Sequence, residues 1–233
     1  MDQTADPHAA PVPLDPVIDG FALGAWQTNC WLIGDRDAGT CVIVDPGQTG
    51  ESVVAPKLLA LGLRCEAILL THAHLDHLWA APHLARTLDV PVHLHPDDRW
   101  IWDDPGAGLG MPPGGLAAQF GIEWDPPTER LVDLRDGQRL LLAGCEITVR
   151  HTPGHTPGSS VFLLDGVLLS GDLLFAMSVG RSDLPGGSSA DLMDSIARVV
   201  LPLSDETRVC CGHGPDTTVG TERFANPFLR SIA

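Results

Sequence analysis

A cluster of three histidines and one aspartate directly follows a short apolar run in this chain. The run covers residues 67–70, and the segment Thr71-His72-Ala73-His74-Leu75-Asp76-His77 follows it. In an extended loop, side chains two positions apart point to the same side, so His72 and His74 can bind one metal ion. Asp76 and His77 can then reach a second ion. A polar turn without a metal is the alternative, because short motifs also match by chance.

The residues after this cluster favour a helix. Apolar side chains at positions 75, 78, 79 and 84 have a broken helical spacing up to about residue 88. The ligands are therefore expected on a loop between a strand and a helix. Asp76 would lie near the helix start, where the helix dipole favours a carboxylate.

Length and charge limit the class of protein. The chain has 233 residues, 44% of them hydrophobic, which predicts one or two domains with a sizeable core. A net charge of −16 and a single lysine, Lys57, argue against a nucleic-acid or anionic-membrane partner. No apolar run of membrane-spanning length occurs and the N-terminus is acidic, so a cytoplasmic location is expected.

The cysteines indicate reduced thiols. None of them forms a Cys-x-x-Cys pair, and most lie within apolar runs; they are Cys30, Cys41, Cys65, Cys145, Cys210 and Cys211. Buried thiols are therefore expected, without disulfides or a zinc knuckle.

The order of elements predicts a mixed α/β (α+β) domain over residues 16–233, preceded by a disordered or docked tail at 1–15. Strands are expected at 17–23, 29–33, 40–44, 66–70, 90–94, 131–133, 140–142, 146–150, 159–164, 167–170 and 208–211. Helices are expected at 50–61 and 191–201, with a last helical or irregular segment at 219–229. Two sheets packed face to face with helices outside accommodate this pattern.

The segment 96–128 has no clear periodicity but contains Trp100, Trp102 and Trp124. Tryptophan is rare in disordered segments, so an ordered lid or pocket wall is favoured over a surface excursion. Trp100, Trp102 and Met111 could line the acyl side of a pocket, with core packing as the alternative.

Three further metal-binding side chains follow strands and adjoin glycines. They are His155 in His-Thr-Pro-Gly-His-Thr-Pro-Gly-Ser, Asp172 in Ser-Gly-Asp, and His213 in Cys-Gly-His-Gly. Loops at strand ends are common positions for ligands. With the first cluster they give seven nitrogen or oxygen ligands, enough for two ions.

These motifs, with Val44-Asp45-Pro46-Gly47 upstream, resemble the metallo-β-lactamase superfamily over residues 17–229. The resemblance implies an αββα sandwich with a two-ion site. One ion would take His72, His74 and His155, and the other Asp76, His77 and His213, with Asp172 bridging. Asp45 would orient a ligating imidazole, or serve only as a turn residue.

Within the superfamily, the segments 180–187 and 226–229 look like those of glyoxalase II-like hydrolases, also called hydroxyacylglutathione hydrolases. The chain ends soon after His213 and contains no tyrosine, so the short single-domain type is expected and the thiol carrier stays open. The resemblance implies hydrolysis of a 2-hydroxyacyl thioester, such as S-lactoylglutathione or an analogue on another small thiol. Asp76 and Asp172 would act with a hydroxide bridging two divalent ions, zinc first, with iron or manganese as alternatives.

Two other functions remain open. An Fe(II) persulfide dioxygenase of the same superfamily would use His72, His155 and Asp172 as a two-histidine, one-carboxylate triad. A metal-stabilised binding domain without turnover would need a closed coordination sphere. For the hydrolase, Arg181 is the candidate for a substrate carboxylate, with a salt bridge to Asp183 as the alternative.

Overall fold

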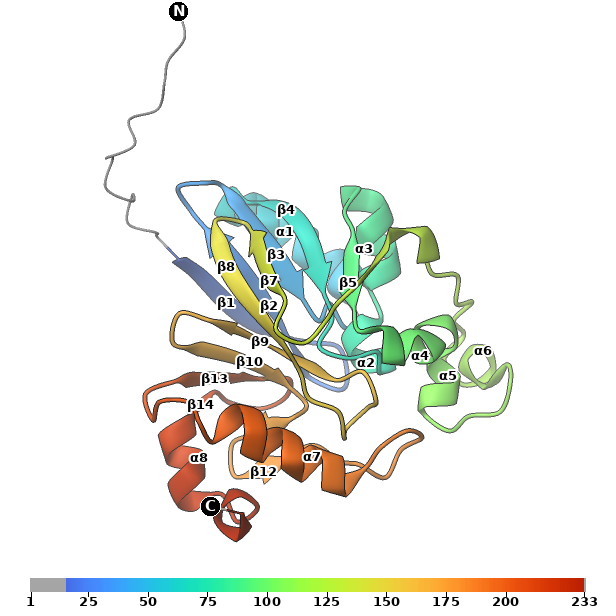
Figure 1. Cartoon of the computed structure of the whole chain (residues 1–233). Helices are drawn as coiled ribbons and strands as arrows, with labels where there is room; N and C mark the ends of the chain where they lie inside the picture. Colours follow the sequence, from blue (N-terminus) through green and yellow to red (C-terminus); the bar gives the residue numbers. More distant parts are fainter. Residues whose placement is uncertain (1–15, 233) are drawn as a thin grey trace, which may run out of the picture.

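The computed structural model describes residues 16–232 (Figure 1), and the tail expected at residues 1–15 lies outside the described residues. The first sheet contains, in spatial order, β1 (Pro16–Leu23), β2 (Thr28–Asp35), β3 (Thr40–Val44), β4 (Arg64–Leu69), β5 (Val92–Leu94) and β6 (Leu131–Asp133). Strands β1 to β3 pair antiparallel, and β3 to β6 pair parallel.

The second sheet is also mixed. Its spatial order is β14 (Thr217–Thr218), β13 (Arg208–Cys211), β10 (Val167–Gly171), β9 (Ser160–Leu164), β8 (Cys145–His151) and β7 (Arg139–Leu142). Only the β10–β13 pair is parallel among these strands. A small hairpin of β11 (Leu174–Phe175) and β12 (Ser178–Val179) follows β10.

Helices cover the outer face of each sheet (Figure 1). Helices α1 (Gly50–Leu61) and α3 (Ala81–Leu88) pack on the first sheet. Helix α7 (Ser189–Ser195), the π-helical turn η3 (Ile196–Val200) and α8 (Val219–Ala225) pack on the second. A last short turn, η4 (Leu229–Ser231), follows α8.

Alternating side chains of the strands explain this layering. In β3, Ile43 faces the helices on the first sheet, whereas Val42 faces the second sheet. In β4, Ile68 and Leu69 divide in the same way, because successive side chains of a strand point to opposite faces. The layers are therefore helix, sheet, sheet and helix, which confirms the predicted αββα sandwich.

The chain differs from the sequence expectation after the histidine cluster. Two helices replace the single one, α2 (Leu75–Leu78) and α3, with a break at residues 79 and 80. Pro82 lies in the first turn of α3, where its missing N–H costs no hydrogen bond. Helix α1 has the predicted bounds, and Gly62 ends it with a φ of 67°.

The segment 96–128 is ordered and largely helical. It contains η1 (Pro96–Asp98), α4 (Arg99–Asp103), α5 (Pro105–Gly108) and α6 (Gly115–Phe120), and η2 (Thr128–Arg130) follows. These helices are too short to produce a recognisable 3.6-residue pattern. Asp104 caps α5 by accepting from the N–H groups of Gly106 and Ala107.

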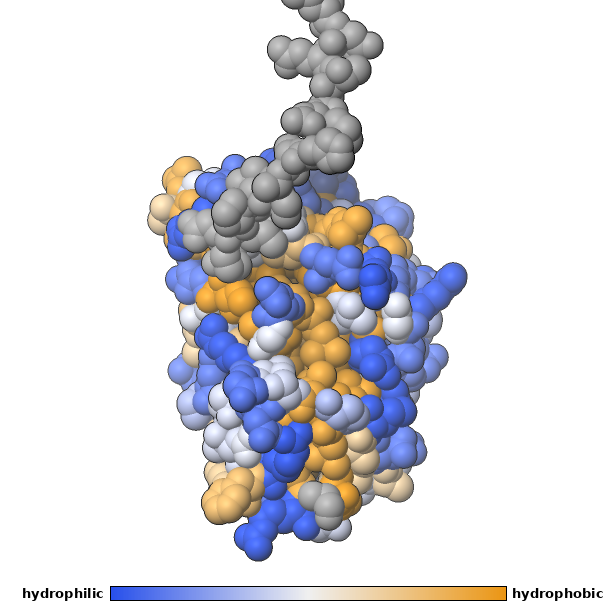
Figure 2. Space-filling view, turned by 60° about the vertical axis from the view of Figure 1, so that its left-hand side comes forward, coloured by the Kyte–Doolittle hydropathy of each residue, from blue (hydrophilic) through white to orange (hydrophobic). Residues whose placement is uncertain are grey.

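The surface is mixed in polarity. Figure 2 shows a band of hydrophobic residues between hydrophilic flanks on the face that it presents. Within residues 16–232, no helix is both long enough and apolar enough to cross a membrane.

Candidate metal centre

All seven predicted ligands lie together at one end of the sandwich, on segments that follow strands. The histidine cluster follows β4, and the other ligands lie in the β8–β9 loop (His155), directly after β10 (Asp172) and after β13 (His213). Main-chain hydrogen bonds join these loops. Ser160 N donates to Thr71 O at 2.7 Å, and Gly212 N donates to Gly171 O at 2.9 Å.

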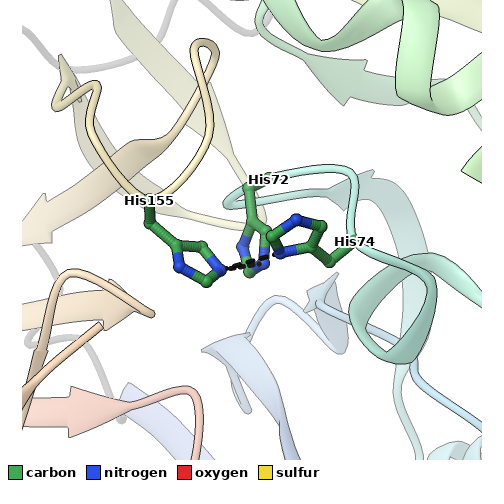
Figure 3. Close-up of side chains that lie close together, drawn as sticks. All are labelled: His72, His74 and His155. Atoms are coloured by element: carbon green, nitrogen blue, oxygen red, sulfur yellow. Dashed lines mark hydrogen bonds between the residues drawn. The ribbon is translucent and has the colours of Figure 1, made fainter. Parts of the chain in front are cut away.

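Three buried imidazoles form the first group (Figure 3). The Nε2 atom of His155 lies 3.1 Å from His72 Nε2 and 2.8 Å from His74 Nδ1. The three nitrogens point toward one another, although His155 comes from a different loop. This is the set that the resemblance implies for the first ion.

The second group comprises Asp76, His77 and His213. The Nε2 atom of His213 lies 3.1 Å from Asp76 Oδ2 and 3.3 Å from His77 Nε2. The ligand atoms of these three residues all lie within 4.8 Å of one another. The second predicted set is therefore assembled as well.

The Asp172 carboxylate lies between the two groups. Its Oδ1 is 3.2 Å from His77 Nε2, and its Oδ2 is 3.6 Å from His155 Nε2. Gly212 leaves room for it, because a Cβ at position 212 would lie 2.2 Å from Asp172 Oδ1. Asp172 thus occupies the position of a bridging ligand.

The outward nitrogens of the imidazoles test whether this arrangement suits a cation. The Nδ1 atom of His155 donates to Arg181 O at 2.7 Å, and that of His213 donates to Trp26 O at 3.2 Å. A carbonyl only accepts, so in the neutral form of each ring the inward Nε2 atom carries the lone pair. Lone pairs facing each other at about 3 Å repel unless a cation lies between them. The residues present therefore fit a metal ion.

Asp45 also orients His77 and His72 so that their Nε2 atoms face inward. Its Oδ2 accepts from His77 Nδ1 at 2.9 Å and from Thr71 Oγ1 at 2.6 Å. Because the Thr71 hydroxyl donates to Asp45, it accepts from His72 Nδ1 at 3.0 Å. Asp45 takes up a φ of 50° at the end of β3 to make these contacts. The sequence prediction that it orients an imidazole agrees with this geometry.

The surroundings shift the histidine pKa values in two directions. Burial lowers the pKa of His74 to about 3 and that of His72 well below its ordinary value, so both rings are neutral, as metal binding requires. Burial opposes a charge on His77 too, but Asp172, Asp76 and Asp45 together raise its pKa well above the ordinary value. These three carboxylates favour a positive charge beside His77, and a cation bound by the neutral ring would supply it in place of a proton.

A second buried carboxylate, Asp98, was not predicted. Its Oδ2 accepts from Ala73 N at 3.0 Å and Thr156 Oγ1 at 2.7 Å, and its Oδ1 accepts from Gly158 N at 2.6 Å. Burial raises the pKa of this carboxyl, although these hydrogen bonds counteract the effect. Asp98 therefore ties the loop of His72 and His74 to the loop of His155. The sequence carries no signal that separates it from neighbouring aspartates.

A cavity of about 660 Å³ opens onto the site. Met111 and Arg181 line it as expected, but Trp100 and Trp102 are not among the lining residues. Trp102 is fully buried in the core, as the alternative expectation of core packing held. Leu109 and Phe120 also line the cavity, so the segment 96–128 supplies part of the pocket wall.

The Arg181 guanidinium forms a two-point ion pair with Asp183, at 2.7 and 2.8 Å. The structure therefore shows the alternative that the sequence offered, a salt bridge between Arg181 and Asp183. The carbonyl of Arg181 orients His155. Binding of a substrate carboxylate by Arg181 stays a prediction.

A third group of possible ligands, His95, Asp97 and His151, lies away from this site. The two rings stack in parallel with centroids 3.8 Å apart, and His151 Nε2 donates to Pro157 O at 2.8 Å. That donation leaves the nitrogen without a lone pair for an ion. His151 therefore holds the His155 loop through this hydrogen bond.

Comparison with known proteins agrees with the geometry. A family model described as the metallo-beta-lactamase superfamily matches residues 23–213. The hydroxyacylglutathione hydrolase GloC of Haemophilus influenzae is 35% identical over 92% of this chain and 98% of its own length.

Solved structures show the same architecture. BLEG-1, a B3 metallo-beta-lactamase, is 37% identical with a TM-score of 0.80 and coverage of 91% of this chain and 99% of its own. TTHA1623 in a di-iron-bound form is 40% identical, with a TM-score of 0.76 and coverage of 91% and 100%. ETHE1 from Myxococcus xanthus is 25% identical, with a TM-score of 0.73 and coverage of 91% and 83%.

Proposed function

The chain belongs to the metallo-β-lactamase superfamily, and we propose that it is a two-metal hydrolase that cleaves thioesters of 2-hydroxy acids. The observation that carries the proposal is the pair of ligand groups joined by Asp172. Hydrogen bonds at the outward nitrogens of His72, His77, His155 and His213 orient these four rings with Nε2 facing inward. The similarity to GloC supports the choice of a thioester substrate.

His72, His74 and His155 would hold one divalent ion, and Asp76, His77 and His213 the other, with Asp172 shared. When bound, such ions polarise a carbonyl and lower the pKa of water toward about 7. Zinc is proposed first, and the di-iron form of TTHA1623 makes iron the main alternative.

The protein's own side chains orient the site without supplying a nucleophile. Burial raises the pKa of Cys210 and Cys211 to about 12, so neither is a thiolate at neutral pH. The Ser170 hydroxyl donates to Leu174 O at 2.8 Å and has no histidine beside it among the contacts of the described residues. The nucleophile is therefore expected to be water.

The rival function is Fe(II)-dependent persulfide oxidation, which the similarity to ETHE1 keeps open. That reaction would use His72, His155 and Asp172 as iron ligands, and the second group would take no part in it. The assembled second group supports the hydrolase instead.

The test follows thiol release from S-lactoylglutathione, and from lactoyl thioesters of other small thiols, under anaerobic conditions with zinc-loaded protein. In parallel, O₂ uptake is measured with glutathione persulfide and iron-loaded protein. We expect anaerobic thioester cleavage. Rapid O₂ uptake with negligible cleavage would overturn the proposal.

A further inference from the structure

The first residues of β2 connect the two sheets beside the metal centre. Strand β2 belongs to the first sheet, yet Thr28 forms an isolated antiparallel bridge with His213, which follows β13 of the second sheet. The main-chain N–H of Asn29 also donates to Gly212 O at 2.7 Å. The start of β2 is therefore fixed against the segment that carries one ligand of the second group.

The Thr28 hydroxyl contacts another ligand of this group. It donates to Asp76 Oδ2 at 3.1 Å, because an ionised carboxylate only accepts. The same oxygen lies 3.1 Å from His213 Nε2 and 3.5 Å from His77 Nε2. Thr28 is fully buried, so water does not compete for its hydroxyl. The hydrogen bond thus holds the carboxylate oxygen that faces the two imidazoles.

The Asn29 side chain holds the His213 segment on both sides. Its Nδ2 atom carries two hydrogens and donates to Cys211 O at 3.0 Å and to Gly214 O at 2.9 Å. His213 lies between these two positions in the chain. Its ring is oriented in turn by Trp26 O, in the turn that precedes β2. One short stretch of chain therefore positions both Asp76 and His213.

We propose that Thr28 and Asn29 are positioning residues that set the affinity of the second group for its ion, although neither is a ligand. This role requires the two-metal site of the function proposed above, but it does not depend on the substrate. Within residues 16–232, neither side chain forms a hydrogen bond to the first group. Their loss should therefore weaken the second ion selectively.

Zinc titration of the metal-free protein against a competing chelator measures the dissociation constants of both ions. Thr28→Val replaces the hydroxyl with a methyl group of similar size, and we expect the second ion to bind about 10- to 100-fold more weakly. The first ion should be unaffected. Thr28→Ser keeps the hydroxyl and should bind both ions as the wild type does. His213→Ala removes a ligand of the second group, so its remaining constant identifies the first ion.

Asn29→Asp tests the second residue at constant side-chain size. A carboxylate cannot donate to the two carbonyls that the amide holds, so the second ion should again bind more weakly. Thr207→Val is the matched control for Thr28→Val and should keep both affinities. Thr207 is also buried but precedes β13, and no hydrogen bond within residues 16–232 joins its hydroxyl to a proposed ligand.

Unchanged binding of the second ion in Thr28→Val or Asn29→Asp, beside a wild type that binds two ions, would show that the residue concerned has no such role. Equal weakening of both ions would also overturn the proposal, because it would indicate general damage. A wild type that binds one ion would contradict the two-ion site and this role together. Two bound ions with the expected losses, but no thioester cleavage, would contradict only the hydrolase.

Discussion

Two buried carboxylates outside the ligand groups, Asp45 and Asp98, determine how the ligands are held. Asp45 contacts His77 directly and reaches His72 through Thr71. Asp98 contacts no ligand side chain but fixes the main chain at Ala73 and Gly158. Partners of this kind typically change metal affinity by about 10- to 100-fold when they are lost.

Asp98→Asn should therefore lower affinity for the ion at His72, His74 and His155 by about 10- to 100-fold. An amide offers one accepting oxygen, so its NH₂ would face either Gly158 N–H or the donors Ala73 and Thr156. Chelator competition measures the affinity. Asp97→Asn is the control, since Asp97 is an exposed neighbour. Unchanged metal affinity in Asp98→Asn would show that Asp98 does not position these ligands.

The sequence predicted which side chains lie together at the site better than it predicted most of the groups that orient them. A ligand such as His155 stands in a motif with glycines on both sides, so its type and spacing can be recognised. Asp98 and Trp26 act through main-chain contacts with segments far away in the chain, which residue type does not reveal. Arg181 shows the same limit, because the sequence offered both Asp183 and a substrate carboxylate as its partner and did not decide between them.

At the scale of elements, the site depends on how closely the ends of β10 and β13 approach. Gly171 and Gly212 are joined by a main-chain hydrogen bond of 2.9 Å, and Asp172 lies against Gly212. No side chain fits at position 212 without displacing Asp172 or His77. The glycine is required by this contact between strand ends.

Gly212→Ala should accordingly lose the second ion and most activity, because the new methyl group would lie 2.2 Å from Asp172 Oδ1 and 2.9 Å from His77 Cε1. Elemental analysis and kcat report the two effects. Gly214→Ala controls for backbone strain: Gly214 has a φ of 74°, but its Cβ would meet nothing within 4 Å. That control should lose about 1 kcal/mol of stability and keep its metal. Full metal content in Gly212→Ala would show that the contact is not needed.

Element types were predictable where one pattern covers a whole element. Helix α1 has its predicted bounds because Gly62 marks the end clearly. The short helices of 96–128 were missed, since each is set by local prolines and caps such as Asp104. The two-residue strands β11 and β12 were missed because they are too short for an alternating pattern.

At the scale of the molecule, three apolar layers hold the sandwich together and bury the cysteines. All six thiols are buried and free, as the sequence predicted. Burial raises the pKa of Cys41 and Cys65 to about 12 from an ordinary value of 9.0. Thiols in such surroundings react slowly.

The raised pKa values of these thiols determine how the free energy of unfolding depends on pH. Between pH 9 and 12 the folded state keeps protons that the unfolded state loses, so the free energy of unfolding should fall as pH rises through this range. The chain has no tyrosine and one lysine, so few other groups titrate there. Urea unfolding at pH 8 and pH 11 measures the difference. A thiol reagent should modify six cysteines only after unfolding. Rapid modification of the native protein, or constant stability, would contradict the buried assignment.

We propose that one chain holds two divalent ions between two groups of side chains that share Asp172. The groups are His72, His74 and His155, and Asp76, His77 and His213. Elemental analysis after reconstitution with excess zinc or iron and mild dialysis measures this stoichiometry, on the wild type and on Asp172→Ala. We expect about two equivalents per chain for the wild type and loss of most of the metal in the variant. One equivalent in the wild type, or full metal content in Asp172→Ala, would show that the two-ion site is wrong.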